Sequence, residues 1–352
     1  MRSCQKKRKE VLEVPSRRSF RRVLAKRLVN VVITIFGIMI LNFLLIHFMP
    51  GDPLSNMVPK GARYQNLRWS LSEKFHLNAS LPEQLVVYLY NTITLDWGVS
   101  YQYNRSVSSI IFQDLKWTML LVGSSTFIMV ILGIIIGALS AYRRGSAFDV
   151  SATAITLFFY GMPVFWFALI LQLVFTTNAN PLGISWWPQL PPSGYYDVGR
   201  FGPELKWELP IILSVLKYLI LPAATLAIGS LAGVSLVMRG ALVDTMTEDY
   251  ILTARAKGLT DYGVLRHHAL PNGMPPMVAL IAMDIAFIIG GAYQVEWVFN
   301  YPGLGFRTIT SIGDLDFPIL QFIVVVGGVA VVVANFLADM ILYYIDPRIK
   351  IS

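Results

Sequence analysis

The sequence predicts an all-α protein that crosses a membrane several times, and three observations support this prediction. Of the 352 residues, 55% are hydrophobic and only 14% are charged, and the mean hydropathy is +0.57. A soluble domain carries roughly 25% charged residues, so this chain has too little polar surface to face water over most of its area. Its apolar residues also gather into long separate runs. These features exclude the soluble globular and disordered classes.

Each predicted span follows from its length, because about 20 mostly apolar residues cross the hydrocarbon core of a bilayer. Five runs meet this criterion. A sixth run is as long but holds Asp284, and it begins with Pro275 and Pro276, where proline does least harm to a helix. We therefore expect six transmembrane helices. In chain order they are Leu28–Met49, Trp117–Tyr142, Val150–Phe175, Tyr218–Met238, Met274–Val295 and Ile319–Ile345.

The positions of Lys and Arg predict the orientation of the chain, since short cationic loops stay in the cytoplasm. With the N-terminus inside, 19 of the 29 Lys and Arg residues lie on the cytoplasmic side. They fall in the N-terminal segment, the Arg143–Arg144 turn, the loop 239–273 and the C-terminal tail. The net charge of +8 is thus explained by orientation in a lipid bilayer, and we expect no nucleic-acid partner.

These assignments divide the chain into five parts. In order they are a basic cytoplasmic segment 1–27, a first span 28–49, an outer connection 50–116, a five-helix core 117–345 that includes the loop 239–273, and a cytoplasmic tail 346–352. The apolar segment Leu81–Leu95 of the outer connection is too short to span, so we expect a helix at the membrane interface. The pairs Gly133/Gly137 and Gly229/Gly233 have the spacing of close helix packing.

The chain lacks the residue patterns of an energy-converting or catalytic site. No Gly-Lys dipeptide occurs, which excludes a phosphate-binding P-loop. The four histidines have no cysteines beside them, so we expect no metal site, and His267 and His268 are interpreted as helix surface groups. A membrane protease would need an acid pair or a Ser–His pair at membrane depth, which we do not find. We therefore expect no enzymatic activity and no cofactor in this chain.

Two acidic residues are candidates for the translocation path. Asp284 is the one acid near the middle of a predicted span, where a carboxylate is a functional candidate by default. Facing a water-filled path, it could contact a cation or carry a proton; its alternative role is to pair with a neighbouring helix. Glu296 follows the fifth predicted span, beside Trp297, and either faces the path or caps a helix end.

The predicted cytoplasmic loop contains the most informative segment, Met246–Asn272. Thr247 is a suitable N-cap, acidic residues fill the first turn and basic residues the last, so we expect a helix of about ten residues over 248–258. Thr260 can cap a second helix that runs to Pro271. A short amphipathic helix held between two spans suits docking into a groove on a partner protein. The alternative is a surface helix that only covers the bundle.

Several motifs in this loop and beyond it resemble one known family. Ala254, Gly258 and, after nine further residues, the run His268–Pro271 resemble the cytoplasmic EAA loop of permease subunits in binding-protein-dependent ABC importers. The run Tyr250–Gly258 is similar to the branch that imports dipeptides, oligopeptides and nickel. Four other segments agree with that branch, namely Met49–Pro53, Asp96–Ser100, Val295–Gly305 and Asp346–Arg348.

The resemblance implies a permease that forms half of a translocation pathway in the plasma membrane of a prokaryote. Its partners would be a second homologous permease, two ATPase subunits that bind ATP and Mg²⁺, and an external substrate-binding protein. The substrate would be a peptide, with oligosaccharides or nickel as alternatives, and an ion-coupled secondary transporter is the competing class. The ATPase-coupling residues would be Tyr250, Thr253, Ala254, Lys257, Gly258, Leu270 and Pro271.

The loop departs from the general pattern of the family at two positions. Leu252 stands where the pattern has glutamate, and Thr253 stands in place of its first alanine. An electrostatic contact through that glutamate is therefore not expected here. The small side chain of Ala254 would let the coupling helix lie close to the ATPase. Gly258 would form a left-handed cap that breaks the chain between two short helices.

Overall fold

A computed structural model describes most of the chain as helices. The described residues are 17–48, 65–74, 78–176, 189–202, 208–277, 280–281 and 292–345. Within them, four helices are long and apolar enough to cross a membrane, which confirms the prediction of an all-α, multi-pass protein. These four are α2 (Arg17–His47), α5 (Val107–Tyr142), α9 (Leu209–Thr245) and α16 (Phe317–Ile345).

Three of these helices begin well before the predicted spans, and the first of them, α2, begins eleven residues before Leu28. Helix α5 begins ten residues before Trp117, and α9 begins nine residues before Tyr218. The predicted span begins only at Trp117, and the charged residues Asp114 and Lys116 lie just before it. Asp114 is nevertheless buried within α5, where an ion pair with Arg307 compensates its charge.

The third predicted span, Val150–Phe175, is not one continuous helix, so that prediction is wrong. The segment forms α6 (Ala147–Tyr160) and α7 (Val164–Thr176), which are bent by 101° at the short break between them. Pro163 lies in this break. Proline cannot donate a backbone hydrogen bond and disfavours helical geometry at the residue before it, which accounts for the interruption. Counted together, the bent pair adds at most one span to the four.

The fifth predicted span, Met274–Val295, lies largely outside the described residues. Its two ends are described as the segment up to Met277 and the start of α14 (Tyr293–Val298). The described part of the chain thus contains four spans, or five with the bent pair, and the number six stays a prediction.

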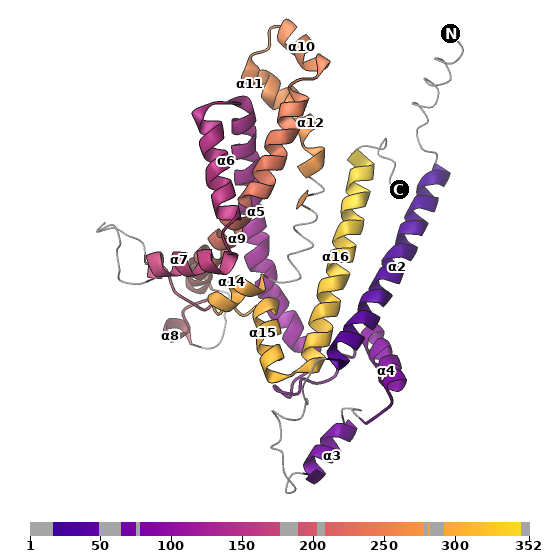
Figure 1. The fold of residues 1–352 in the computed structure, drawn as a ribbon. Helices are drawn as coiled ribbons and strands as arrows, with labels where there is room; N and C mark the ends of the chain where they lie inside the picture. Colours follow the sequence, from indigo (N-terminus) through magenta and orange to yellow (C-terminus); the bar gives the residue numbers. More distant parts are fainter. Residues whose placement is uncertain are drawn as a thin grey trace.

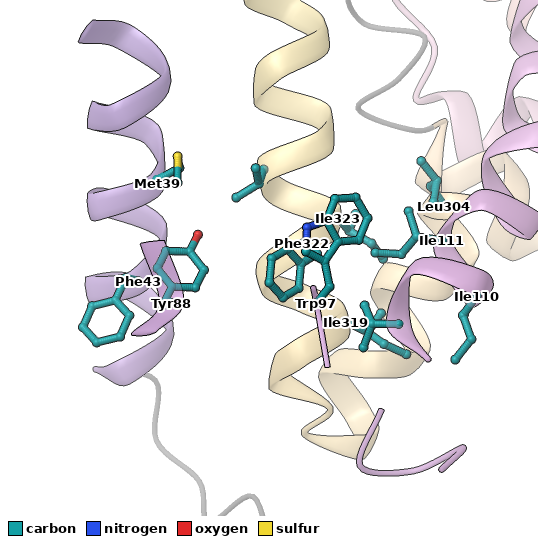
Figure 2. Close-up of a cluster of buried hydrophobic side chains, with 12 residues drawn as sticks. Met39, Phe43, Tyr88, Trp97, Ile110, Ile111, Leu304, Ile319, Phe322 and Ile323 are labelled. Atoms are coloured by element: carbon teal, nitrogen blue, oxygen red, sulfur yellow. The ribbon is translucent and has the colours of Figure 1, made fainter. Parts of the chain in front are cut away.

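The first outer connection contains two short helices, α3 (Gln65–Lys74) and α4 (Leu81–Thr94). Helix α4 coincides with the apolar segment expected at the membrane interface, and it ends at Leu95 in a left-handed conformation, with φ of 60°. One face of α4 packs on α2. Figure 2 shows Tyr88 of α4 beside Phe43 of α2, and Trp97 stacked against Phe322 of α16. The loop around Trp97 is therefore held by the same apolar cluster as α2 and α16.

Helices α5 and α9 pack closely against each other. A Cβ atom on Gly133 would lie 2.5 Å from Val234 Cγ1, and one on Gly137 would lie 2.5 Å from the Ser235 carbonyl oxygen. Close packing at this glycine pair is thus confirmed. At the second pair no close packing is found among the described residues, where a Cβ on Gly229 would lie 3.8 Å from Val164 Cγ2 and one on Gly233 would meet no atom within 4 Å.

Different helices lie at the two ends of the molecule. In Figure 1 the start of α2, the end of α16 and the turn between α5 and α6 lie toward the same end as α10 (Asp249–Ala256). Helices α3 and α4 lie toward the opposite end (Figure 1). Basic residues cluster in or near the first set of elements, and the side of the membrane on which this end lies stays a prediction.

Candidate functional site

The predicted coupling helix is α10, which is slightly shorter than expected. Its N-cap is Glu248 and not Thr247, whose hydroxyl donates instead to the Asp244 carbonyl at 2.7 Å, at the end of α9. The helix ends at Ala256, and Gly258 has a φ of +86°, so the predicted left-handed cap is confirmed. A Cβ on Gly258 would meet no atom within 4 Å. Only the backbone conformation, and no clash, therefore requires glycine there.

The second helix of the loop begins as predicted. Thr260 Oγ1 accepts a hydrogen bond from the Gly263 N–H at 3.2 Å and so caps α11 (Asp261–Val264). A wide π-helical turn, η2 (Leu265–Ala269), follows and leads into α12 (Leu270–Gly273). Pro271 removes a donor and crowds the carbonyl four residues earlier, which accounts for the wider turn before it. The helix thus passes Pro271 and ends two residues later than expected.

The buried face of α10 packs on its own chain. Ile251 is fully buried and Ala254 is 4% exposed. Both belong to a cluster, here called the loop core, with residues of α9 and of the helix after α10. Its other members at this end of the molecule are Met238, Leu242, Val264, Leu265 and Ala269. The small side chain of Ala254 therefore lies beneath α10 against this chain, whereas the sequence suggested that it approaches the partner.

The opposite face of α10 is exposed. The Tyr250 side chain is 40% exposed and Leu252 is 60% exposed, and Thr253 and Lys257 are exposed on the same helix. Arg255 pairs with Asp261 of α11 at 3.2 Å, which ties the two helices together at the surface. Of the remaining expected coupling residues, Leu270 is half-buried and Pro271 is exposed. The exposed face is thus partly apolar and available to a partner.

Glu296 is fully buried in α14, which lies beside α7 and α15, away from α10 (Figure 1). Its Oε1 accepts from the Thr118 hydroxyl at 2.7 Å, and its Oε2 accepts from the Phe306 N–H at 3.0 Å. The Leu304 N–H in turn donates to Thr118 Oγ1 at 2.8 Å. Carboxylate and hydroxyl together satisfy free N–H groups at the start of α15 (Leu304–Asp314). The described contacts of Glu296 are thus those of a helix cap, formed across to a neighbouring helix.

The glycines of the segment Tyr301–Gly305 are explained by this cap. A Cβ on Gly303 would collide with the carboxylate of Glu296, and one on Gly305 would collide with the backbone of Tyr293. Glycine at both positions lets α14 and α15 approach closely enough for the carboxylate to reach its donors. Asp284, the other candidate for the translocation path, lies outside the described residues.

Sequence reasoning missed two further polar contacts, which involve α15 and the turn that follows it. Arg307 Nε lies 2.6 Å from Asp114 Oδ2, and the guanidinium also lies over the Tyr103 ring, 4.8 Å from its centroid. Asp316 is fully buried and accepts from the Ser100 hydroxyl at 2.5 Å and from the next two backbone N–H groups at 3.2 and 3.1 Å. Burial, and after it the Asp316 carboxylate, raise the pKa of the Tyr101 phenol. The motif Asp96–Ser100 was the only signal for these contacts.

A third missed pair lies near α10. Arg239 of α9 donates to Asp149 of α6 through Nε at 2.6 Å and through Nη2 at 2.8 Å. The two residues are 90 positions apart, so no local pattern joins them. Neither residue lies in a sequence motif, and in the sequence each one looks like an ordinary charged residue at the end of a predicted span.

The sequence is similar to proteins of one transport family over most of its length. Residues 130–351 match the family described as binding-protein-dependent transport system inner membrane component. A putative peptide permease protein of Brucella suis biovar 1 is 33% identical over 320 residues, which cover 90% of this chain and 95% of the relative. The oligopeptide transport system permease protein AppB of Bacillus subtilis is 34% identical over 318 residues, with coverage of 90% and 95%. The dipeptide transport system permease protein DppB of Escherichia coli K12 is 28% identical over 345 residues.

A solved structure shares the fold. The chain matches a structure of inward facing conformations of the MetNI methionine ABC transporter, with a TM-score of 0.50 and 16% sequence identity. The match covers 68% of this chain and 97% of that chain. At this identity the likeness concerns the fold alone, and it confirms the permease architecture that the loop motif implied.

Proposed function

The chain belongs to the family of binding-protein-dependent transport system inner membrane components, and on that premise we propose that it is the membrane-spanning subunit of an ATP-driven peptide importer. It is a multi-pass permease of a prokaryotic plasma membrane. The names of its relatives support peptides as the substrate, since the relatives described above are named as peptide, oligopeptide or dipeptide permeases. In this proposal it forms half of the pathway, paired with a second homologous permease.

The observation that carries the proposal is the two-faced packing of α10. Its buried residues Ile251 and Ala254 pack on α11 and η2, within the loop core that also contains residues of α9, while Tyr250 and Leu252 are exposed. A helix held in this way transmits a displacement applied to its outer face to the rest of the chain, because packed cores do not deform continuously. A partner that moves during an ATP cycle can therefore displace α10 as a rigid element.

The source of that displacement is a pair of ATPase subunits on the cytoplasmic side. This chain has no Gly-Lys dipeptide and so no P-loop, and we assign ATP and Mg²⁺ to those partner chains. Closure of the two ATPases around ATP would move α10, and with it α9 and the pathway. Both termini then lie in the cytoplasm with α10, and the outer loops receive peptide from a substrate-binding protein. The apolar Leu252 implies an apolar contact at the point where the general family pattern has a glutamate.

Reconstitution in proteoliposomes tests the proposal. The permease pair, the ATPases and the binding protein are assembled, and uptake of a labelled dipeptide is followed with ATP or a non-hydrolysable analogue on the ATPase side. We expect uptake only with hydrolysable ATP and binding protein. Uptake by the permease pair without ATPases, driven by an ion gradient, would support a secondary transporter instead. Labelled nickel and an oligosaccharide, supplied with the same components, test the alternative substrates.

A further inference from the structure

An ion pair between a buried carboxylate and a partly exposed guanidinium joins α6 and α9 close to the coupling loop. Asp149, in the first turn of α6, is 3% exposed. Arg239 of α9 contacts both of its carboxylate oxygens, at 2.6 and 2.8 Å. Two parallel bonds between a guanidinium and a carboxylate fix the relative orientation of the two groups as well as their distance. The pair therefore fixes how the start of α6 sits on α9.

The same carboxylate also fixes the turn between α5 and α6. The Gly145 N–H donates to Asp149 Oδ2 at 2.9 Å, and Gly145 adopts a φ of +78°. The Asp149 N–H is in turn capped by the Ser146 hydroxyl at 3.3 Å. On the α5 side, a Cβ on Gly137 would lie 3.1 Å from the Arg239 N atom, so the α5 backbone touches α9 at the level of the ion pair. Asp149 thus connects three elements at one point.

Arg239 lies in the part of α9 that carries the loop core. Met238 directly precedes it and Leu242 follows within one turn, and both are fully buried in the cluster that holds Ile251 and Ala254 of α10. On the other side of Leu242, a Cβ on Gly273 would lie 2.9 Å from its Cδ2. Helix α10 packs on α11 and η2, and α12 packs on α9. A movement of α10 therefore reaches α9 through the loop core, at the helical turn that is bonded to Asp149.

We propose that Asp149 and Arg239 are positioning residues that make the α5–α6 hairpin follow α9 when α10 moves. The proposal rests on the function proposed above, because it assigns the pair a role in ATP-driven transport. Helix α6 continues through its 101° bend into α7. In α7, the Gln172 side-chain amide donates to the Pro192 carbonyl oxygen at 2.6 Å and to the Val298 carbonyl oxygen of α14 at 3.4 Å. The pair thereby links the coupling loop to the helix that holds Glu296.

Stability alone does not explain this pair. Replacing both members of a buried ion pair by apolar residues of similar size is often neutral or stabilising, whereas removing one partner is strongly destabilising. The apolar seam of α5 and α9, with Gly133 and Gly137, holds those two helices together without it. Among the described residues, the ion pair supplies the directional bonds from α6 to α9, so its removal should loosen the link and leave the fold intact.

The test uses Arg239→Lys and the double variant Asp149→Leu/Arg239→Met in the complete reconstituted importer. Lysine keeps the charge but cannot form two parallel bonds, and the double variant removes both charges at once. We expect both to assemble with the ATPases and to hydrolyse ATP. The amount of peptide imported per ATP should fall between about 5- and 150-fold, the range of coupling free energies that link two sites. The matched control is Arg144→Lys, an exposed arginine in the same turn, which should keep the wild-type ratio.

A second measurement does not depend on transport. Spin labels at Val150 of α6 and Thr247 beside α10, both exposed, report the distance between the two elements in the assembled complex. We expect one narrow distance distribution in the wild type, with and without ATP, and a broadened one in Arg239→Lys. An unchanged import ratio in both variants, or a wild-type distance that changes with ATP, would overturn the proposal. Absence of ATP-dependent uptake in the wild type would count against the function proposed above. The distance measurement would still test whether the ion pair joins the two elements.

Discussion

Replacing Ala254 by leucine tests whether α10 is fixed to its own chain. The substitution adds an isopropyl group to a side chain that is 4% exposed and enclosed by the loop core. Overpacking of this kind costs about 1–3 kcal/mol. If this free-energy cost destabilises only α10, the equilibrium constant for local opening of the helix increases about 5- to 140-fold.

Hydrogen exchange of the isolated permease measures that opening. The reporting amides are Lys257 and Gly258, which donate to the carbonyl oxygens of Thr253 and Arg255 at 3.1 and 2.9 Å. The matched control is Ala256→Leu, the same change at an exposed position of the same helix. We expect faster exchange in Ala254→Leu and wild-type exchange in Ala256→Leu. Equal exchange in the two variants would show that Ala254 is not packed in the loop core, and the reasoning would fail.

Three further predictions concern individual residues. Gly258→Ala places a side chain at a φ of +86° and should destabilise the folded loop by about 1–3 kcal/mol. Gly258→Asn should destabilise it less, because Asn tolerates this conformation. Peptide import per ATP is measured for both variants, and equal losses would point to a lost contact in place of backbone strain. Gly303→Ala forces the Glu296 carboxylate away from its donors and should lower the thermal unfolding temperature in detergent, while Gly313→Ala, in open space, should not. Glu296→Gln turns one acceptor into a donor that faces the Thr118 hydroxyl or the Phe306 N–H. The same unfolding assay should show a loss of about 1–3 kcal/mol in stability. An unfolding midpoint equal to that of the wild type would mean that the cap does not form.

Local chemistry made part of the loop predictable. The left-handed cap at Gly258 and the N-cap at Thr260 depend on residues within a few positions of each other, and both are found as expected. The N-cap at Thr247 was wrong by one residue because its hydroxyl bonds back to the end of α9. Helix ends are often displaced in this way, since neighbouring residues compete for the same free backbone groups.

Long-range pairing set the limit of prediction from the sequence. Asp149 and Arg239 are 90 positions apart, and Asp114 and Arg307 are 193 apart, so only the fold brings them together. The inward direction of Ala254 depends in the same way on α9 and on the helix after α10. The bend at Pro163 is a different case: its signal was present, but the continuous hydropathy of the segment outweighed it.

The central claim is that the exposed face of α10 receives the ATPase subunit. A photo-crosslinking residue at position 252, where the native leucine is 60% exposed, tests this most directly in membranes that import peptide. We expect one crosslinked product, formed with a chain that binds ATP. If peptide import continues while position 252 crosslinks only to lipid or to the permease itself, α10 is not the site at which ATP hydrolysis is coupled to transport.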